Sequence, residues 1–458
     1  MKQLTIKEIL NATDGKLIAG DENAVIYDIK QDSRVCGKGD MFVAFIGEVH
    51  DAHKFVGGVL EGECDTVFIS DASCLPDDLT GKNVIQVSDT TYQLGELARW
   101  YLDSLNVKKI AVTGSVGKTS TRDIIYYALS EKYKTGKNYK NYNNAWGLPL
   151  SIFRFDEDTE AVVLEIGMNH FGELDRLADI IRPEIGVLTN IGVSHIENLG
   201  SREGIFKAKM EMAKHIIPGG TLVYVCDDEF LTRERTKGDY SQIEIGNSSD
   251  SDYFISSVDD FGLEGIQFTV VNNGQSSDVK LPLAGVHNAL NGSVAIAVGK
   301  LLGVTLEQVQ AGFDKAELTG SRLKIIKTNL CNIIDDTYNA ATASMKSALT
   351  VLANSKCDGR KIAILGEMYE MGDKSASQHR DVGAFARGLD IDLVIALGNI
   401  ARPIAEAAEG GKAQVMWLET KEELYPELKD IVGQGDTILV KASRGMKLED
   451  VVNQIREL

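Results

Sequence analysis

Short apolar runs separated by stretches of helical periodicity make up most of the chain. The runs are rich in Val, Ile and Leu and end at Gly, Asn or Ser, as is typical of strands buried in a sheet. Between them, apolar residues recur every three or four positions, as is typical of amphipathic helices. This alternation predicts an α/β fold in which helices cover largely parallel sheets.

The runs fall into three segments, which we interpret as domains. Residues 1–105 contain the expected strands DMFVAFIG, CDTVFIS and NVIQVS and end in an amphipathic helix. Residues 106–320 open with the buried strand KKIAVTG, followed by AVVLEIG, EIGVLTN and GTLVYVC. Glycine and Asn-Asn-Gly turns within residues 252–283 predict an antiparallel patch there. Residues 321–458 resume the alternation with NIIDDTY, KIAILG, DLVIALG and DTILVKAS, which predicts a second doubly wound unit.

One predicted helix, residues 201–216, points a lysine toward the core. Its apolar stripe consists of Ile205, Ala208, Met212, Ala213 and Ile216. Lys207, Glu211 and Lys214 fall on the opposite face, where we expect water to surround them. Lys209 projects from the middle of the stripe. Either its stem covers apolar surface while its ammonium reaches water or a carboxylate, or it has a chemical role.

Length, charge and cysteine usage narrow the classes of function. A chain of 458 residues is too long for one core. Its net charge of −19 argues against a general nucleic-acid binder and against an anionic membrane surface. The six cysteines contain no C-x-x-C pair, so we expect reduced thiols and no zinc site. Without a signal peptide or an apolar run long enough to span a bilayer, we expect a soluble cytoplasmic protein.

The clearest chemical signal follows the strand KKIAVTG, at a glycine-rich loop that opens a helix. The loop consists of Thr113, Gly114, Ser115, Val116, Gly117, Lys118 and Thr119. Its backbone N–H groups and the helix N-terminus would face a polyphosphate, Lys118 would reach the outer phosphates, and Thr119 would offer its hydroxyl to Mg²⁺. Val112 stands where the general P-loop has its first glycine. A plain glycine-rich turn would explain the glycines but not Gly-Lys-Thr at the start of a helix.

The shortened loop T-G-S-x-G-K-T resembles that of the Mur ligases, ATP-dependent enzymes that build the peptide of bacterial peptidoglycan. Further segments resemble motifs of this family in the same order: NYNNAWGLPLSIF, LEIGMNHFGEL, TNIGVSHIENLGS, FKAKMEM, LAGVHNALN and DDTYNA. DSRVCGKGDMFVAFIGEVHDAHKF resembles the N-terminal domain of the branch that adds the later residues. The resemblance implies an N-terminal UDP-substrate-binding domain (1–105), a central ATP-binding P-loop domain (106–320) and a Rossmann-like C-terminal domain (321–458).

The resemblance also implies the reaction, an ATP-dependent amide-bond ligation that forms ADP and phosphate. ATP would phosphorylate the terminal carboxylate of UDP-N-acetylmuramoyl-tripeptide, and the amine of D-alanyl-D-alanine would displace phosphate from the acyl phosphate. Clamping the transferring phosphoryl group calls for Mg²⁺, with two ions expected. We expect a cytoplasmic monomer that acts in cell-wall precursor synthesis, with no nucleic-acid partner and no membrane insertion.

The resemblance assigns roles to individual residues. The implied catalytic residues are Lys118, Asn144, His195 and Lys209. The implied metal ligands are Thr119, Glu165, His195 and Lys209. ATP would contact the loop 113–119 together with Asn291, Arg322 and Asp336, and the UDP-sugar end of the substrate would meet Ser33 and Arg34. Taken alone, these positions have plainer interpretations: a helix cap for Glu165 and Asn291, a surface histidine for His195, turns for Asn144 and Ser33–Arg34, a solvated linker for Arg322, and strand-end polarity for Asp336.

For Lys209 the implied state is a carbamate. A protonated lysine beside a second Mg²⁺ would be repelled, whereas burial lowers the pKa of a lysine and exposes a neutral amine that can add CO₂. The resulting anion would offer two oxygens to the metal. The register of FKAKMEM places this modification on Lys209 and not on Lys207.

The chain departs from the family pattern at two places, and two alternatives remain. Ala341 and Thr342 replace the usual Asn-Pro, and Ala52 replaces a usual glycine. One alternative is the sister ligase that adds the diamino acid at the third position, although that enzyme typically reads DYAHTPD where this chain has DDTYNAA. The other is a P-loop kinase or ATP-gated binding protein, which would need neither DDTYNA nor the set Glu165, His195 and Lys209.

Overall fold

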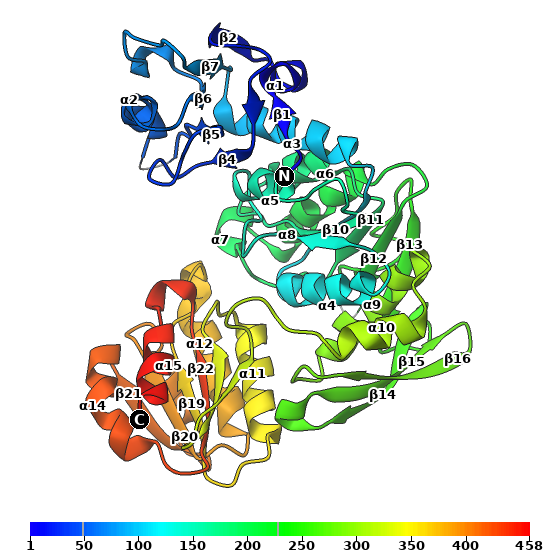
Figure 1. Cartoon of the computed structure of the whole chain (residues 1–458). Coiled ribbons are helices and arrows are strands. Elements are labelled where there is room, and N and C mark those ends of the chain that lie inside the picture. The colour runs from blue at the N-terminus through cyan, green and yellow to red at the C-terminus, as the bar shows by residue number, and fades with distance from the viewer. Residues whose placement is uncertain (48–49, 227–228) are drawn as a thin grey trace.

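Three α/β domains follow one another in the computed structural model, which describes residues 1–47, 50–226 and 229–458 (Figure 1). In Figure 1 the N-terminal domain lies at the top in blue, the central domain in cyan and green, and the C-terminal domain at the bottom in yellow to red. Each domain is built on its own main sheet, of five, nine and six strands among the described residues. The predicted α/β class and three-domain architecture are confirmed.

The N-terminal sheet has the order β2-β7-β6-β5-β4, and β1 pairs with β3 beside it. Its strands are β1 (Leu4–Thr5), β2 (Lys16–Ala19), β3 (Val25–Ile26), β4 (Asp28–Lys30), β5 (Asp40–Val43), β6 (Thr66–Ile69) and β7 (Asn83–Gln86). Its helices are α1 (Ile6–Ala12), α2 (Val56–Glu61) and α3 (Thr90–Ser104). All three predicted strands are present. The α3 helix packs on this sheet and also contacts helices of the central domain, so it joins the two cores.

The central sheet has the order β16-β15-β14-β13-β12-β11-β8-β10-β9 and is parallel except for the expected antiparallel patch β14–β16. Its strands are β8 (Lys108–Thr113), β9 (Thr135–Lys137), β10 (Ala161–Glu165), β11 (Ile185–Leu188), β12 (Thr221–Val225), β13 (Ser241–Gly246), β14 (Tyr253–Asp260), β15 (Ile266–Asn272) and β16 (Gln275–Leu281). The β8 strand lies between β10 and β11, where the strand order reverses. The carboxyl ends of strands at such a switch point border a ligand crevice.

Helices cover both faces of the central sheet. They are α4 (Lys118–Ser130), α5 (Gly147–Ile152), α6 (Glu173–Ile181), α7 (Ile196–Leu199), α8 (Arg202–Met210), α9 (Asn288–Leu301) and α10 (Leu306–Phe313). The α4, α9 and α10 helices bury one face of the sheet, and α3, α5, α6 and α8 bury the other. The two faces therefore have separate apolar cores.

The C-terminal sheet has the order β17-β18-β22-β19-β20-β21, with only β17 antiparallel. Its strands are β17 (Lys324–Lys327), β18 (Asn332–Asp336), β19 (Lys361–Leu365), β20 (Leu393–Leu397), β21 (Gln414–Leu418) and β22 (Thr437–Lys441). Its helices are α11 (Thr342–Asn354), α12 (Ser375–Arg387), α13 (Arg402–Ala408), α14 (Lys421–Ile431) and α15 (Glu449–Arg456). The four strands predicted here are confirmed. No helix in the described ranges is both long and apolar enough to cross a membrane.

The predicted helix 201–216 is correct only in its first half. The α8 helix ends at Met210, and residues Met212–His215 form a tighter 3-10 turn. Glu211 itself keeps helical backbone angles (φ −56°, ψ −37°), but α6 packs against this segment. Glu211 is therefore buried, and it accepts hydrogen bonds from the backbone N–H of Gly172 (2.9 Å) and Asp175 (3.3 Å) at the start of α6. The expected solvated position of Glu211 was therefore wrong, because its carboxylate satisfies the amino terminus of a neighbouring helix.

Several strands were not predicted from the sequence, including β9, β13, β17 and β21. Each carries partly or fully exposed positions, and β9, β13 and β17 lack the continuous apolar run of a strand buried on both faces. The β21 strand does contain such a run, Val-Met-Trp-Leu, which sequence reasoning missed. The β13 strand, for instance, alternates polar and apolar residues next to the antiparallel patch. Pairing partners, and not their own sequence, establish β9, β13 and β17 as strands.

Candidate active site

The phosphate loop leaves the carboxyl end of β8 and runs directly into α4. Gly114 has a φ of +151°, and a Cβ atom there would lie 1.9 Å from Thr189 Oγ1, so only glycine allows the loop to approach the end of β11 this closely. Gly117 has a φ of +85° and caps α4, so the chain turns sharply into the helix. The loop thus ends on a helix amino terminus, where anions bind.

Asn190 holds the first half of this loop. Its carbonyl accepts from Ser115 N (3.1 Å) and its Oδ1 accepts from Val116 N (2.9 Å), while its Nδ2 donates to Val116 O (2.8 Å). Two N–H groups of the loop are therefore engaged within the protein. The sequence predicted that the N–H groups of the whole loop would face a polyphosphate. Because Ser115 and Val116 are engaged, the N–H groups at the start of α4 are the ones expected to do so.

A buried carboxylate lies beside the loop at the end of β10. Glu165 Oε2 accepts from Thr119 Oγ1 (2.6 Å) and its Oε1 accepts from Asn143 Nδ2 (2.7 Å). Asn138 fixes the backbone of Glu165, accepting from its N–H (2.6 Å) and donating to its carbonyl (3.0 Å). The result is a rigid pair of oxygen donors, a hydroxyl and a carboxylate, of the kind that Mg²⁺ prefers.

The Lys118 side chain folds back onto the phosphate loop. Its Nζ donates to Gly114 O (2.9 Å) and to Ser115 O (3.4 Å). Burial lowers the pKa of Lys118, and the Arg322 charge lowers it further, against the opposing effect of Glu165. Within the part of the chain that the structure describes, the hydrogen-bond partners of the ammonium are these two carbonyls, so an anion in the cleft would offset the cost of its burial.

His195 and Lys209 approach the same region from the other side of the crevice. His195 Nδ1 lies 2.9 Å from Glu370 Oε2 of the C-terminal domain, and this contact lowers the pKa of Glu370. Lys209 is 2% exposed, and in the described ranges no carboxylate forms an ion pair with it. Burial, reinforced by the Lys118 charge, lowers the pKa of Lys209 well below its ordinary value. The inward direction expected for Lys209 is confirmed, and no carboxylate neutralises it.

Two strand ends of the C-terminal domain form the opposite wall. The parallel register of β18 and β22 sets Asp336 beside Lys441, and Lys441 Nζ lies 2.7 Å from Asp336 Oδ2. Both side chains are buried. Asp336 Oδ1 also accepts from Leu323 N (3.2 Å), which attaches the interdomain segment to this pair.

Arg322 and Asn291 are also fixed by the protein. Arg322 Nη1 donates to Thr319 O (2.7 Å), and its guanidinium carbon lies 3.6 Å from the centre of the Tyr338 ring. Asn291 Oδ1 accepts from Thr121 Oγ1 of α4 (3.0 Å). Arg322 is therefore not a solvated linker residue, and Asn291 is not a helix cap: it lies inside α9 and joins that helix to α4.

The phosphate loop from Ser115 onward, Glu165, and the two strand ends of the C-terminal domain line a cavity of about 390 Å³ between the central and C-terminal domains. Of the residues that the sequence assigned to ATP or metal, the cavity brings together Ser115, Val116, Gly117, Lys118, Thr119, Glu165, His195, Asn291, Arg322 and Asp336. A neighbouring cavity of about 590 Å³ shares Val116, Gly117 and Asn291 with it. Thr113, Gly114 and Lys209 lie outside the lining of both cavities, behind the loop or in the core.

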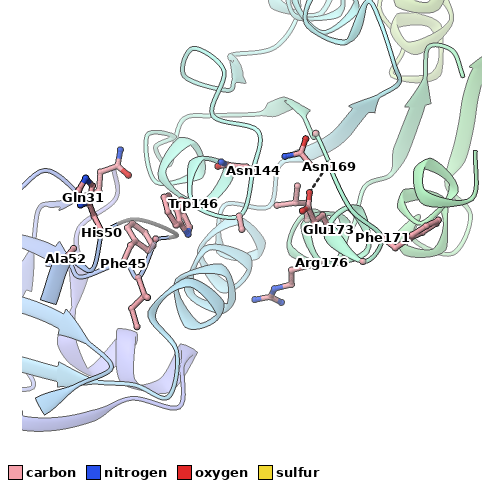
Figure 2. Close-up of a pocket in the computed structure, with 16 residues that line it drawn as sticks. Gln31, Phe45, His50, Ala52, Asn144, Trp146, Asn169, Phe171, Glu173 and Arg176 are labelled. Carbon is pink, nitrogen blue, oxygen red and sulfur yellow. Dashed lines mark hydrogen bonds between the residues drawn. The ribbon is translucent and has the colours of Figure 1, made fainter. Parts of the chain in front are cut away.

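A larger cavity of about 900 Å³ lies between the N-terminal and central domains (Figure 2). Figure 2 shows Gln31, Phe45 and His50 of the N-terminal domain on one side and Glu173 and Arg176 of α6 on the other. The ring of Phe45 stacks on that of Trp146 in the central domain, with centroids 5.3 Å apart. The lining ranges from aromatic rings to charged groups, so the cavity can contact both the apolar and the polar parts of a large ligand.

The two cavities share one stretch of wall. Asn144, Gly167, Asn169 and Glu173 line both the cavity of about 900 Å³ and the one beside the phosphate loop. Asn144 Oδ1 accepts from Gly147 N (2.8 Å), so this residue also stabilises the turn that leads into α5, in line with its plainer interpretation as a turn residue. An extended ligand can therefore occupy the larger cavity and place one end beside Lys118.

Ser33 and Arg34 lie outside all three cavity linings. The Arg34 side chain is 84% exposed and pairs with Asp32 (2.7 Å), and it is the nearby Gln31 that lines the cavity. Their role at the UDP-sugar end stays a prediction.

Sequence reasoning missed Asn143, Lys441 and Glu370. The Asn-rich run NYNN signalled Asn143, but the neighbouring Asn144 was chosen. Lys441 ends a predicted strand, a position that could have drawn attention to it. Nothing in the sequence signalled Glu370, because its contact with His195 joins two domains.

Comparison with known proteins places the chain among ligases. Family models described as Mur ligase middle domain and as Mur ligase, glutamate ligase domain match residues 112–299 and 321–444. The chain is 36% identical over 464 aligned residues to UDP-N-acetylmuramoyl-tripeptide–D-alanyl-D-alanine ligase of Bacillus subtilis, covering 100% of this chain and 99% of that protein.

Solved structures agree over the full length. The chain is similar to MurF from Acinetobacter baumannii, with a TM-score of 0.91, 31% identity and complete coverage of both chains. It is also similar to the MurF ligase from Thermotoga maritima in complex with ADP, with a TM-score of 0.83 and 26% identity, covering 94% of this chain and 97% of that one.

Proposed function

The chain belongs to the Mur ligase family, and from this premise we propose that it uses ATP to join D-alanyl-D-alanine to UDP-N-acetylmuramoyl-tripeptide in peptidoglycan precursor synthesis. The observation that carries the proposal is similarity over the entire chain to ligases named for this reaction. The connected cavities support it, because a long nucleotide-linked peptide must bring only its terminal carboxylate to the phosphate loop. ATP and UDP-linked substrates also agree with the expected cytoplasmic location.

We propose that ATP occupies the cavity beside the phosphate loop. The amino terminus of α4 and Lys118 would bind its phosphates, because both present positive charge at that end of the cleft. Asp336 would receive the ribose and Arg322 would contact the phosphates from the interdomain segment. A transferring phosphoryl group needs such preorganised charge more than covalent help from the protein.

The donor set beside the loop fits Mg²⁺. Thr119 Oγ1 and Glu165 Oε2 already point toward one another at 2.6 Å, and His195 lines the same cavity. Thr119 and Glu165 would hold one ion, and His195 together with Lys209 a second. Bound Mg²⁺ would neutralise charge on the phosphates. Asn143 keeps the carboxylate oriented by donating to its other oxygen.

Asn144 lies where the acceptor carboxylate must arrive. It borders both cavities, so its amide can contact the terminal carboxylate of the peptide while the rest of the substrate fills the larger cavity. Phosphorylation there, followed by attack of the D-alanyl-D-alanine amine, would form the amide bond and release ADP and phosphate. The wall of C-terminal residues would exclude water from the acyl phosphate.

We also propose that Lys209 acts as a carbamate. It is buried, has no carboxylate partner in the described part of the chain, and its lowered pKa favours the neutral amine that reacts with CO₂. The neutral amine adds CO₂ and releases one proton, which leaves a carbamate anion near Lys118. This anion attracts the Lys118 charge and would supply oxygen ligands for metal.

The reaction is tested by phosphate release. We expect release with UDP-N-acetylmuramoyl-tripeptide, ATP and Mg²⁺ to depend on added D-alanyl-D-alanine. Release that is unchanged when the dipeptide is omitted would exclude the ligase and favour a kinase or an ATP-gated protein. Release with UDP-N-acetylmuramoyl-dipeptide and a diamino acid, but not with the first pair, would identify the sister ligase.

The Lys209 carbamate is tested with matched variants. We expect Lys209→Ala to be almost inactive and partly rescued by acetate, and Lys207→Ala, whose side chain is 66% exposed, to be near normal. Carbon-13 bicarbonate should give a carbamate NMR signal in the parent protein and in Lys207→Ala, and none in Lys209→Ala. The same signal in all three proteins, or in none, would return Lys209 to an unmodified buried lysine.

A further inference from the structure

Two cysteines of the N-terminal domain are in direct contact although they are 28 positions apart in the sequence. Cys36 Sγ lies 2.9 Å from Cys64 Sγ, and both are free thiols in this structure. Cys36 precedes β5 and Cys64 precedes β6, and these parallel neighbours pair Met41 with Thr66. Both thiols therefore lie at the same amino-terminal edge of the sheet, held by strand register.

We propose that Cys36 and Cys64 are a redox modification site that a small-molecule disulfide converts reversibly into a protein disulfide. Cys36 is partly exposed and can meet such a reagent, whereas Cys64 is 1% exposed and can reach only Cys36. One accessible thiol with a second thiol already in contact is the arrangement that favours closure over a lasting mixed disulfide.

The remaining cysteines do not share this arrangement. Cys74 Sγ contacts Asp71 O (2.9 Å), Cys226 Sγ contacts Ser251 Oγ (3.1 Å), Cys331 Sγ contacts Thr328 Oγ1 (3.7 Å), and Cys357 Sγ contacts Arg360 O (3.2 Å). Within the described ranges, Cys36 and Cys64 are the cysteine pair with a recorded sulfur–sulfur contact. A selective reaction at one pair is therefore expected.

The chemistry is two successive thiol–disulfide exchanges. Cys36 Sγ attacks one sulfur of the reagent as its proton passes to the Cys64 thiolate with which it is in contact. The S–S bond of the reagent breaks, and the leaving thiolate takes up that proton from Cys64. The thiolate of Cys64 then attacks Cys36 Sγ, forms the protein S–S bond and expels the second thiolate. The two protein thiols lose two electrons and two protons, and the reagent is reduced to two small thiols.

The surroundings of the pair ease the loss of the first proton. The hydrogen bond between the two thiols lowers the pKa of Cys64 to about 7 and raises that of Cys36. One shared proton thus stabilises one thiolate near neutral pH. The bond would fix the segment that follows Gln31, Ser33 and Arg34 against β6, away from the ATP cavity.

The test is thiol mapping of the full chain in a glutathione buffer. After oxidation with glutathione disulfide and blocking with N-ethylmaleimide, we expect two fewer blocked thiols, a mass lower by about 2 Da before blocking, and a peptide linking Cys36 to Cys64. Dithiothreitol should restore both thiols. Cys36→Ser and Cys64→Ser should each abolish the linked peptide, and the matched variant Cys74→Ser should retain it.

Thermal unfolding distinguishes a protein that contains the Cys36–Cys64 disulfide from one that oxidation has misfolded. The linked protein should unfold at a higher temperature than its reduced form, by about 5 °C, because the bond restricts the unfolded chain. Dithiothreitol should remove this increase, and Cys36→Ser should show none. Six blockable thiols after oxidation, a stable glutathione adduct at Cys36 or a link between other cysteines would overturn the proposal. None of these outcomes depends on the ligase reaction.

Discussion

Asp123→Asn should destabilise the central domain more than its small change in shape suggests. Asp123 is fully buried on α4, one turn after the phosphate loop. Its Oδ1 accepts from Arg122 Nη2 (2.7 Å) and Lys137 Nζ (2.7 Å), and its Oδ2 accepts from Thr319 N (2.6 Å). One carboxylate therefore neutralises two cations and attaches the interdomain segment to the phosphate-loop helix.

The expected loss of stability comes from the two cations and the backbone N–H that would lose their carboxylate partner. An asparagine keeps one oxygen for the cations, but its amide donor would face the N–H of Thr319, and the negative charge is gone. Breaking a buried ion pair from one side costs about 3–5 kcal/mol. Arg122 is fully buried, and its other partners among the described residues are Lys140 O at 3.2 Å and Glu165 at 3.7 Å, whereas Lys137 is partly exposed and can rehydrate. We therefore expect about 3 kcal/mol, roughly a hundredfold in the folding constant.

The assay is urea unfolding followed by circular dichroism, with the transition of the central domain assigned by its shift on adding ATP. Asp103→Asn is the matched control, because Asp103 pairs with Lys109 at 2.6 Å while 47% exposed, and an exposed pair contributes at most about 1 kcal/mol. A loss below about 1 kcal/mol in Asp123→Asn, or equal losses in the two variants, would refute the reasoning.

The pH dependence of the same variant provides an independent check. Burial would raise the pKa of Asp123, but the Arg122 and Lys137 charges and the hydrogen bonds hold it below its ordinary value. A carboxylate with a lowered folded pKa stabilises the fold above its unfolded pKa of about 3.9 and loses this contribution as the pH falls through the folded value. The difference between the parent protein and Asp123→Asn should therefore be full at pH 7 and shrink in acid.

Four further outcomes are expected. Lys118→Ala should keep the thermal transition and lose nearly all turnover, since its charge matters only beside phosphate; an active variant would rule out this loop as the ATP site. Small-angle scattering with an ATP analogue and tripeptide substrate should show a smaller radius of gyration as the C-terminal domain closes about the segment 320–322, and no change would count against closure. Glu211→Ala should lower stability by about 1–2 kcal/mol in urea unfolding, because two N–H groups of α6 lose their acceptor, whereas a neutral result would deny the capping role. His379 is buried and accepts from Met368 N (2.9 Å), and burial lowers its pKa, so stability should fall as the pH drops below about 6.5, with a shallower slope in His379→Gln by thermal melting; parallel slopes would contradict this.

Local patterns in the chain determined the order of its elements and the place of its phosphate loop. Buried strands such as β8 and β10 can be identified from their continuous apolar runs, Ile110–Val112 and Ala161–Leu164, because both faces of these runs are buried. Gly114 and Gly117 could be identified because the backbone conformation that they adopt is a property of the loop itself. The inward direction of Lys209 also followed from local periodicity.

Tertiary structure decided which distant side chains meet, and that depends on packing that no local pattern records. The ion pair of Asp336 with Lys441 requires the register of two strands that are separated by a hundred residues of chain, and the contact of His195 with Glu370 requires two domains to dock. Glu211 looked solvated by periodicity, but α6 packs against this segment and offers the carboxylate the N–H groups at its amino terminus. Contact between distant groups is fixed by the burial of whole faces, since the free energy of that burial exceeds the preference of any one polar side chain for water.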